Sequence, residues 1–244
     1  MNGKEVIKMS GITIGFLILG SAFVAPFAPA DTGQLHTVSG AIHINGTKVT
    51  TEGPKSRKEV VVYLENVGEQ AYPPPPTESA LLDQRGLVFI PHVMAIQKGT
   101  TVDFLNSDTT EHNVFCPDEV CILVGDVNSK KPEYLDLGNF AGGEKADYTF
   151  DRSGEAVMLC KLHPEMAAYI IVLETPYFTV AEIDGATQTA RFSIEGVPAG
   201  KYVVRTWNKW CESIEQELEV GEDDASELTI DMQRKQRKRK KRSK

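Results

Sequence analysis

From residue 31 onward, the sequence alternates between short runs of strand-forming residues and clusters of turn residues. Runs rich in Val, Ile, Tyr, Phe and Thr recur between Gly, Pro, Asn and Asp, as in 58–64, 146–150 and 200–207. This pattern is typical of β-strands joined by turns, and no stretch shows a sustained helical period. With 244 residues, the chain is long enough for one or two domains with proper cores. We therefore predict an all-β protein.

The segment 160–166 reads Cys-Lys-Leu-His-Pro-Glu-Met and places a thiolate, an imidazole and a thioether close together. Pro164 disfavours helix at the residue before it. Strand-forming runs flank the segment at 155–159 and 168–173, so it is predicted to be a bent loop between strands. Two imidazoles, a thiolate and a distant thioether are the ligands of blue-copper electron-transfer sites, and His112 offers the second imidazole. The alternative is that these residues pack in a core, as single Cys and Met residues usually do.

Residues 85–174 resemble a cupredoxin, the family of plastocyanin, azurin and amicyanin. The loop Cys-x-x-His-Pro-x-Met is similar to that of amicyanin. Further likeness to the family lies in 89–91, 98–106 and 111–115, and a narrower likeness to plastocyanin-like, methylamine-utilisation-type proteins lies in 136–138 and 174–178. The resemblance implies a Greek-key β-sandwich that holds one type 1 copper ion.

The same resemblance implies four copper ligands: His112, Cys160 and His163 in the equatorial plane and Met166 in the axial position. Asn113 would direct its backbone N–H toward the ligand sulfur, and its side chain would tie the two ligand loops together. Pro164 would support the ligands from the bend that follows His163. Such partners orient the ligands and tune the reduction potential.

Four cysteines are present, and one of them, Cys160, is assigned to copper. Cys116 and Cys121 lie in an insertion that plastocyanin and amicyanin do not suggest. They are close enough in sequence to form a disulfide, which an exported protein permits; two free thiols or a secondary metal site are the alternatives. Cys211 is expected to be a buried small hydrophobe.

The first 30 residues have the pattern of a secretory signal peptide. Lys4 and Lys8 precede an apolar run over 11–24, and small residues follow at 28–30. The apolar run is shorter than the roughly 20 residues that a membrane span needs. We therefore expect a periplasmic or extracellular protein, which would be membrane-anchored if the segment is not cleaved.

The segments that flank the cupredoxin-like region also resemble a known family. Residues 34–68 and 176–232 are similar to the two halves of a carboxypeptidase-regulatory-like (transthyretin-like) β-sandwich. Our hypothesis is a discontinuous second domain, joined to the cupredoxin-like region by a proline-rich linker over 69–84. In the alternative, the first strands extend the cupredoxin sheet. Pairing between 60–64 and 202–205 would decide between them.

The charge of the chain is unevenly distributed. Residues 234–244 carry nine of the 26 Lys and Arg residues, although the whole chain has a net charge of −8. A basic block of this kind repels itself, so 233–244 is expected to be a disordered tail. On an exported acidic protein it would contact an anionic envelope or an acidic partner, and nucleic acid is not expected; a merely solvating tail is the alternative.

These features predict an exported blue copper protein that carries single electrons between redox partner proteins. In relatives, electrons pass through the exposed edge of the His in the Cys-to-Met loop, here His163. We expect no enzyme, because the sequence offers neither a second ligand set with an open position nor a Ser-His-Asp context. The alternatives are an envelope copper-storage or adhesion protein and an electron-feeding subunit of a copper-dependent oxidoreductase.

Overall fold

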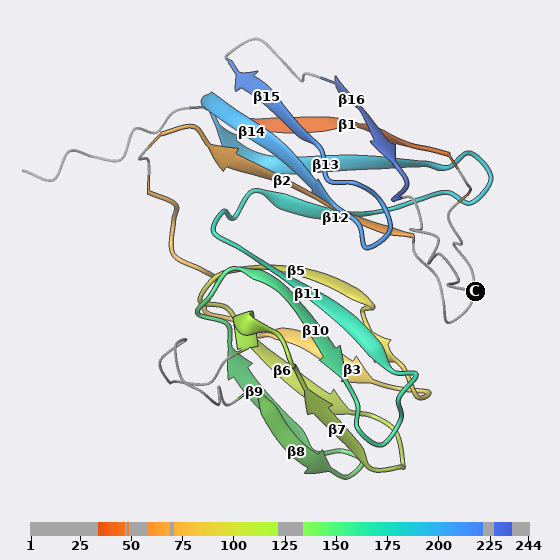
Figure 1. The fold of residues 1–244 in the computed structure, drawn as a ribbon. Helices are drawn as coiled ribbons and strands as arrows, with labels where there is room; N and C mark the ends of the chain where they lie inside the picture. The colour runs from red at the N-terminus through yellow and green to blue at the C-terminus, as the bar shows by residue number, and fades with distance from the viewer. Residues whose placement is uncertain are drawn as a thin grey trace, which may run out of the picture. The chain divides into compact units, whose positions relative to one another are not determined.

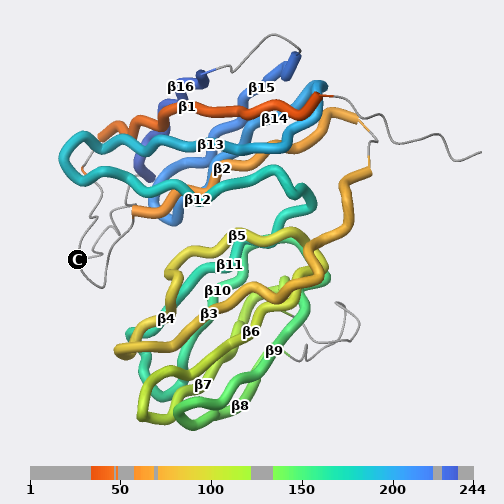
Figure 2. The backbone as a smooth tube through the Cα atoms, turned by 180° about the vertical axis from the view of Figure 1, so that it is seen from behind, coloured from red at the N-terminus to blue at the C-terminus, as the bar shows by residue number. Residues whose placement is uncertain are grey.

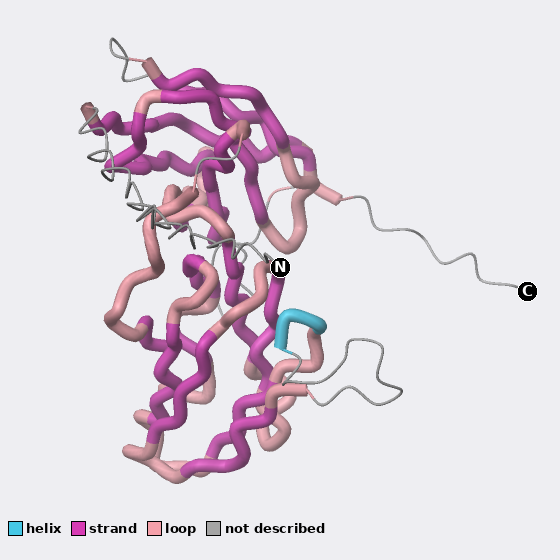
Figure 3. Tube along the Cα trace, turned by 90° about the vertical axis from the view of Figure 1, so that its left-hand side faces the viewer, coloured by secondary structure: helices cyan, strands magenta, loops and turns pink. Residues whose placement is uncertain are grey.

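The computed structural model describes residues 34–46, 48, 58–68, 71–121, 134–221 and 227–235. These residues form sixteen strands and one short 3₁₀ helix, Glu119–Cys121, which confirms the all-β prediction (Figure 3). Within the described ranges, no helix has the length and apolar character needed to cross a bilayer. The predicted signal peptide (1–30) and residues 236–244 of the basic tail lie outside the described residues.

One β-sandwich, called here the ligand sandwich, is built from strands β3 to β11 (Figure 1). Its sheets have the strand orders β5-β11-β10-β7-β8 and β4-β3-β6-β9. The strands are β3 Ala80–Gln84, β4 Phe89–Ile90, β5 Val93–Gln97, β6 Thr101–Asn106, β7 His112–Phe115, β8 Asp136–Phe140, β9 Lys145–Thr149, β10 Gly154–Leu159 and β11 Ala167–Leu173. Alternate residues of a strand face opposite sides of its sheet. The core therefore takes Val102 and Phe104 from β6 and Ala156 and Met158 from β10.

The second β-sandwich, called here the terminal sandwich, combines strands from both ends of the chain (Figure 2). Its sheets have the orders β13-β1-β16 and β12-β2-β14-β15. The strands are β1 Leu35–Asn45, β2 Glu59–Asn66, β12 Phe178–Glu182, β13 Thr189–Pro198, β14 Gly200–Trp207, β15 Glu215–Val220 and β16 Glu227–Gln233. A separate apolar core fills it, with Ile42, Leu64, Tyr202 and Ile230 almost fully buried.

Strand β2 pairs with β14 in the register that the discontinuous arrangement requires. The antiparallel pairs run from Val61 with Trp207 to Asn66 with Tyr202. On its other side β2 pairs with β12, and neither β1 nor β2 adds to a sheet of the ligand sandwich. Among the described residues, the alternative in which the first strands extend the cupredoxin-like sheet is therefore wrong.

Two expected boundaries differ from the structure. The linker predicted over 69–84 ends earlier, because Ala80–Gln84 is strand β3 and pairs in parallel with β6. The hydrophobic pattern did not predict this strand, because Asp83 and Gln84 are polar although they are buried. The tail predicted to start at 233 also begins in ordered structure: Gln233 ends β16, and the Lys235 N–H donates to the Trp210 carbonyl at 2.8 Å.

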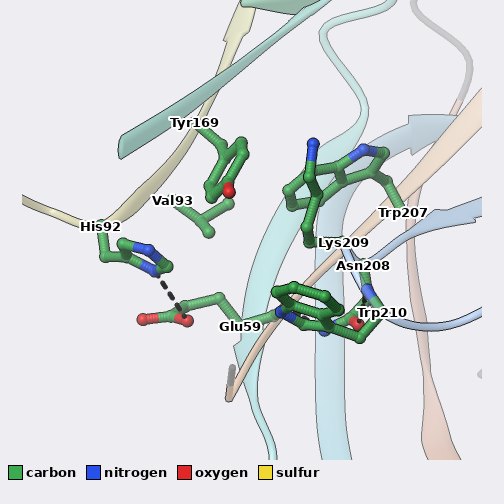
Figure 4. A pocket seen from close by; sticks show the side chains of 8 residues that line it. All are labelled: Glu59, His92, Val93, Tyr169, Trp207, Asn208, Lys209 and Trp210. Carbon is green, nitrogen blue, oxygen red and sulfur yellow. Dashed lines mark hydrogen bonds and ion pairs between the residues drawn. The ribbon is translucent and has the colours of Figure 1, made fainter. Parts of the chain in front are cut away.

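The two sandwiches contact each other through an apolar cluster that contains Val61, Val93, Ile171 and Leu173, each at most 6% exposed. Polar groups surround it. At the rim of a small hollow, His92 lies beside Glu59 at 3.4 Å (Figure 4). The contact therefore combines apolar burial with partly buried polar pairing.

Glu155 makes a paired contact across this interface. Its carboxylate accepts hydrogen bonds from the Trp207 indole at 3.0 Å and from the Lys209 ammonium at 2.5 Å. Partial burial raises the pKa of Glu155, but the bonds from Lys209 and Trp207 lower it more, so the pKa lies below its usual value. The folded state therefore favours the ionised carboxylate.

We predict that Glu155→Gln lowers the free energy of unfolding at pH 7 by about 1 kcal/mol, because the pair is partly exposed. Since the pKa of Glu155 is lower in the folded than in the unfolded chain, its contribution is complete above the unfolded pKa of about 4.3. The contribution disappears as the pH falls through the folded pKa. Urea unfolding between pH 7 and pH 3 should thus show the variant and the wild type converging in acid. Glu195→Gln, at an exposed position of β13, is the control; a constant difference at every pH would contradict the prediction.

Candidate metal centre

The four predicted ligands come from two segments that strand pairing brings together. His112 is the first residue of β7, and Cys160 directly follows β10. Strands β7 and β10 are neighbours in one sheet and pair at Phe115 and Leu159. The segments that carry His112 and Cys160 consequently lie side by side.

Three ligand atoms converge on one point. The Nδ1 atoms of His112 and His163 are 3.1 Å apart, and the Cys160 Sγ lies 4.0 Å from the first and 3.7 Å from the second. Among the described residues, these three form the one group of His, Cys and acidic side chains whose ligand atoms lie close enough together to hold a metal ion. The structure thus brings together three residues that are up to 51 positions apart in sequence.

The spacing of these atoms fits a metal ion between them. Bond lengths of about 2.0 Å to nitrogen and about 2.3 Å to sulfur, as in zinc sites, place neighbouring ligand atoms roughly 3.3–3.8 Å apart. The observed distances of 3.1, 3.7 and 4.0 Å bracket this range. A thiolate with two imidazoles is also the donor set that suits copper in both of its oxidation states.

Two of the three convergent side chains are buried, and the third is partly exposed to solvent. His112 and Cys160 are 0% and 3% exposed, whereas His163 is only half-buried. Met166 is 1% exposed and lies in the same core cluster as Cys160. Its N–H donates to the His163 carbonyl at 3.0 Å, so the chain turns between these two residues.

Asn113 makes the contacts expected of it. Its backbone N–H points to the Cys160 sulfur at 3.4 Å, and its side-chain oxygen accepts from the Lys161 N–H at 3.3 Å. Its amide nitrogen donates to Asp136 and to the Gly138 carbonyl, both at 2.9 Å. Asn113 therefore ties the cysteine loop to strands β7 and β8.

Residues 78–173 match the model of the family described as copper binding proteins, plastocyanin/azurin family. The matched range contains His112, Cys160, His163 and Met166. This segment is a cupredoxin domain. Its metal is copper, which agrees with the donor set of the three convergent side chains.

Solved structures similar to the chain include a copper(I) form of an amicyanin variant, with 18% identity, a TM-score of 0.33, and coverage of 38% of this chain and 81% of that one. A purple cupredoxin from Nitrosopumilus maritimus has 22% identity and a TM-score of 0.31, and the match covers 38% of this chain and 99% of that one. A copper-containing nitrite reductase from Thermus scotoductus has 23% identity and a TM-score of 0.32, covering 55% of this chain and 28% of that one. No curated protein matches the chain.

Asp136 supports the cupredoxin site from β8. Besides Asn113, its carboxylate pairs with the Lys161 ammonium and accepts from the Gly138 N–H at 3.0 Å. Partial burial raises the pKa of Asp136, but the bonds from Lys161 and Asn113 lower it more, so the pKa lies below its usual value. The ionised carboxylate thus holds Asn113 and the residue after Cys160 at the same time.

The sequence analysis did not identify Asp108, which contacts a predicted ligand directly. Its Oδ2 lies 2.9 Å from the His112 Nε2, the ring nitrogen opposite the one that faces Cys160. The Leu87 N–H is the main cause that lowers the pKa of Asp108 below its usual value, with help from Gly86 and His112. No sequence motif marks Asp108. The available sequence signal for it is a carboxylate four residues before the predicted ligand His112.

The two cysteines of the insertion form a disulfide, Cys116–Cys121. Its Cys116 end is fully buried in the core of the cupredoxin domain. The structure thus favours the disulfide over the free thiols and the secondary metal site. Cys211 is a buried free cysteine in the terminal sandwich, as expected. Pro164 is exposed at the bend after His163.

Proposed function

We propose that this protein is an exported type 1 copper protein that passes single electrons between redox partner proteins. His112, Cys160 and His163 would be the equatorial ligands and Met166 the axial ligand. The observation that carries this proposal is the convergence of two Nδ1 atoms and one sulfur at 3.1–4.0 Å inside a cupredoxin domain. Copper bound there supplies one-electron chemistry between Cu(II) and Cu(I).

The surroundings of the site support electron exchange with little rearrangement. Hydrogen bonds at Asn113, Asp136 and Asp108 hold the ligand segments on β7 and after β10. Half-buried His163 is the ligand that reaches toward the surface, and its neighbour Leu162 is 43% exposed. We infer that a partner protein docks at this edge and exchanges electrons through the His163 ring.

The ligand set supports a carrier more than an enzyme. Cupredoxin domains are typically electron carriers. An enzyme needs a metal position that substrate or water can enter, and with Met166 as the axial ligand the four side chains would enclose the ion. An electron-feeding role beside a separate catalytic subunit remains compatible with the same site.

The disulfide Cys116–Cys121 supports export, because such bonds persist in oxidising compartments. We infer that the mature protein acts in the periplasm or outside the cell. There the basic tail would contact an anionic envelope surface or an acidic partner, and not nucleic acid.

We further propose that 34–68 and 176–232 form one discontinuous carboxypeptidase-regulatory-like domain around the cupredoxin domain. The pairing of β2 with β12 and β14 supports this proposal, as does their common core. By that resemblance the domain would serve docking or adhesion.

Reconstitution of the metal-free protein with Cu(II) tests the proposed function. We expect one copper ion per chain, an intense visible absorption band, bleaching of that band by ascorbate and its recovery on reoxidation. A colourless copper complex that does not respond to ascorbate would instead support a storage role. Copurification with an oxidoreductase would identify the electron-feeding role.

A further inference from the structure

We propose that Asp108 is a positioning residue of the copper site, whose carboxylate anchors both the ligand His112 and the exposed turn Arg85–Val88. The inference rests on the proposed ligand role of His112. The contacts of Asp108 lie outside the sequence motifs that carry the proposed ligands. They connect the segment before His112 to the turn Arg85–Val88, which is far away in the sequence.

The carboxylate binds three N–H groups from two segments. Its Oδ2 lies 2.9 Å from His112 Nε2 and accepts from the Leu87 N–H at 3.0 Å, while its Oδ1 accepts from the Gly86 N–H at 2.6 Å. A carboxylate only accepts hydrogen bonds, so His112 must carry its proton on Nε2. The lone pair of Nδ1 is then directed toward Cys160 and His163, where the metal would bind.

The turn Arg85–Val88 has an unfavourable backbone conformation, which hydrogen bonds to its N–H groups stabilise. Gly86 and Leu87 have φ angles of 68° and 62°, and the Arg85 N–H donates to the Val88 carbonyl at 3.0 Å. Left-handed backbone is unfavourable for a residue with a side chain such as Leu87. Successive N–H groups in such a turn form a concave site for an anion, and the Asp108 carboxylate occupies it.

The backbone of Asp108 is itself held in place by neighbouring residues. Its N–H donates to the Asn106 side chain at 2.9 Å. Fully buried Asn106 also donates to the Thr110 and Phe140 carbonyls at 2.8 and 3.0 Å. The Asp108 carbonyl lies only 2.2 Å from where a Cβ on Gly142 would be. The segment between β6 and β7 is therefore closely packed, and Asp108 can act as a rigid connection.

Negative charge at Asp108 should also affect the metal. A carboxylate that accepts the Nε2 proton increases the donor strength of the imidazole. A stronger donor stabilises Cu(II) relative to Cu(I). We therefore expect Asp108 to lower the reduction potential, and its removal to raise it.

The test compares Asp108→Asn and Asp108→Ala in the full chain, with Asp103→Asn as a matched control. Asp103 is on β6 of the same sandwich and pairs with Lys145 at 2.9 Å. In the metal-free protein, nitrogen NMR of His112 should show the Nε2-protonated form in the wild type and a mixture of tautomers in Asp108→Ala. Amide exchange at Gly86 and Leu87 should be about tenfold faster, as expected for loss of one charge-assisted hydrogen bond. In the copper-loaded protein, both Asp108 variants should have a raised reduction potential.

The metal-free measurements separate this inference from the proposed function. If the wild type shows no type 1 copper spectrum but the tautomer and exchange results hold, the anchoring role stands and the electron-transfer role fails. If the wild type is blue but tautomer, exchange and potential are unchanged in both Asp108 variants, the inference is wrong. A potential shift of equal size in Asp103→Asn would also overturn it, because the effect would then be one of overall charge. Asp108→Asn keeps an acceptor oxygen and remains informative if Asp108→Ala does not fold.

Discussion

Replacing Cys160 with serine should abolish the intense visible absorption of the copper-loaded protein. The absorption requires charge transfer from a thiolate sulfur to Cu(II), and a serine hydroxyl is a hard, un-ionised ligand that cannot supply it. Cys160 is the free cysteine whose Sγ lies 3.7 and 4.0 Å from two imidazole Nδ1 atoms. Absorption spectroscopy after addition of Cu(II) measures the effect, and we expect complete loss of the band.

Cys211→Ser is the matched control for this variant. Cys211 is the other free cysteine and is 1% exposed, as deeply buried as Cys160, but it lies in the core of the terminal sandwich. Both substitutions bury a hydroxyl at a cost of about 1–3 kcal/mol, so circular dichroism should show similar folding for both. A Cys160→Ser protein that stays blue, or a Cys211→Ser protein that loses the colour to the same extent, would overturn the assignment of the thiolate.

Replacing Gly40 with alanine should strongly destabilise the terminal sandwich. Gly40 lies in β1 between β13 and β16, where it pairs with Phe192 and Leu228. A Cβ at this position would lie 2.3 Å from the Leu228 carbonyl oxygen and 2.9 Å from the Phe192 ring. Because the closer atom is backbone, relief requires displacement of strand β16. We expect a loss of about 3 kcal/mol in the free energy of unfolding, the upper end for overpacked positions.

Tryptophan fluorescence during urea unfolding measures this effect. Both tryptophans of the chain, Trp207 and Trp210, belong to the terminal sandwich or the turn after β14. Gly221→Ala is the control, since a Cβ at that position would have no atom within 4 Å, and it should change stability by less than about 0.5 kcal/mol. Equal midpoints for the two variants would show that β1 is not inserted between β13 and β16.

The proposed ligand residues stand out in the sequence because their chemistry is local. Cys160, His163 and Met166 lie in one loop, and the choice of thiolate, imidazole and thioether is specific to few metals. His112 was the candidate for the second imidazole, and the likeness to cupredoxins supplied the role of Asn113. The pairing of 60–64 with 202–205 was named as the observation that would decide between a discontinuous sandwich and an extended cupredoxin sheet, and the structure has this pairing.

The supporting contacts could not be predicted in the same way. Asp108 acquires its role only because the turn at Gly86 and Leu87 folds next to it, and a sequence does not show which loops meet. Asp136 lies in the segment 136–138, which resembles methylamine-utilisation-type proteins. Its ion pair with Lys161, however, depends on strand register. Strand β3 was placed in the linker, since Asp83 and Gln84 are polar although they are buried.

The most direct test of the central claim is X-ray absorption at the copper edge of the reconstituted protein. Two imidazoles and one thiolate around a single ion should give two nitrogen neighbours at about 2.0 Å and one sulfur neighbour at about 2.3 Å or slightly less. Cys160→Ser should lose the sulfur contribution alone. A copper ion surrounded only by nitrogen and oxygen in the wild type would contradict the account.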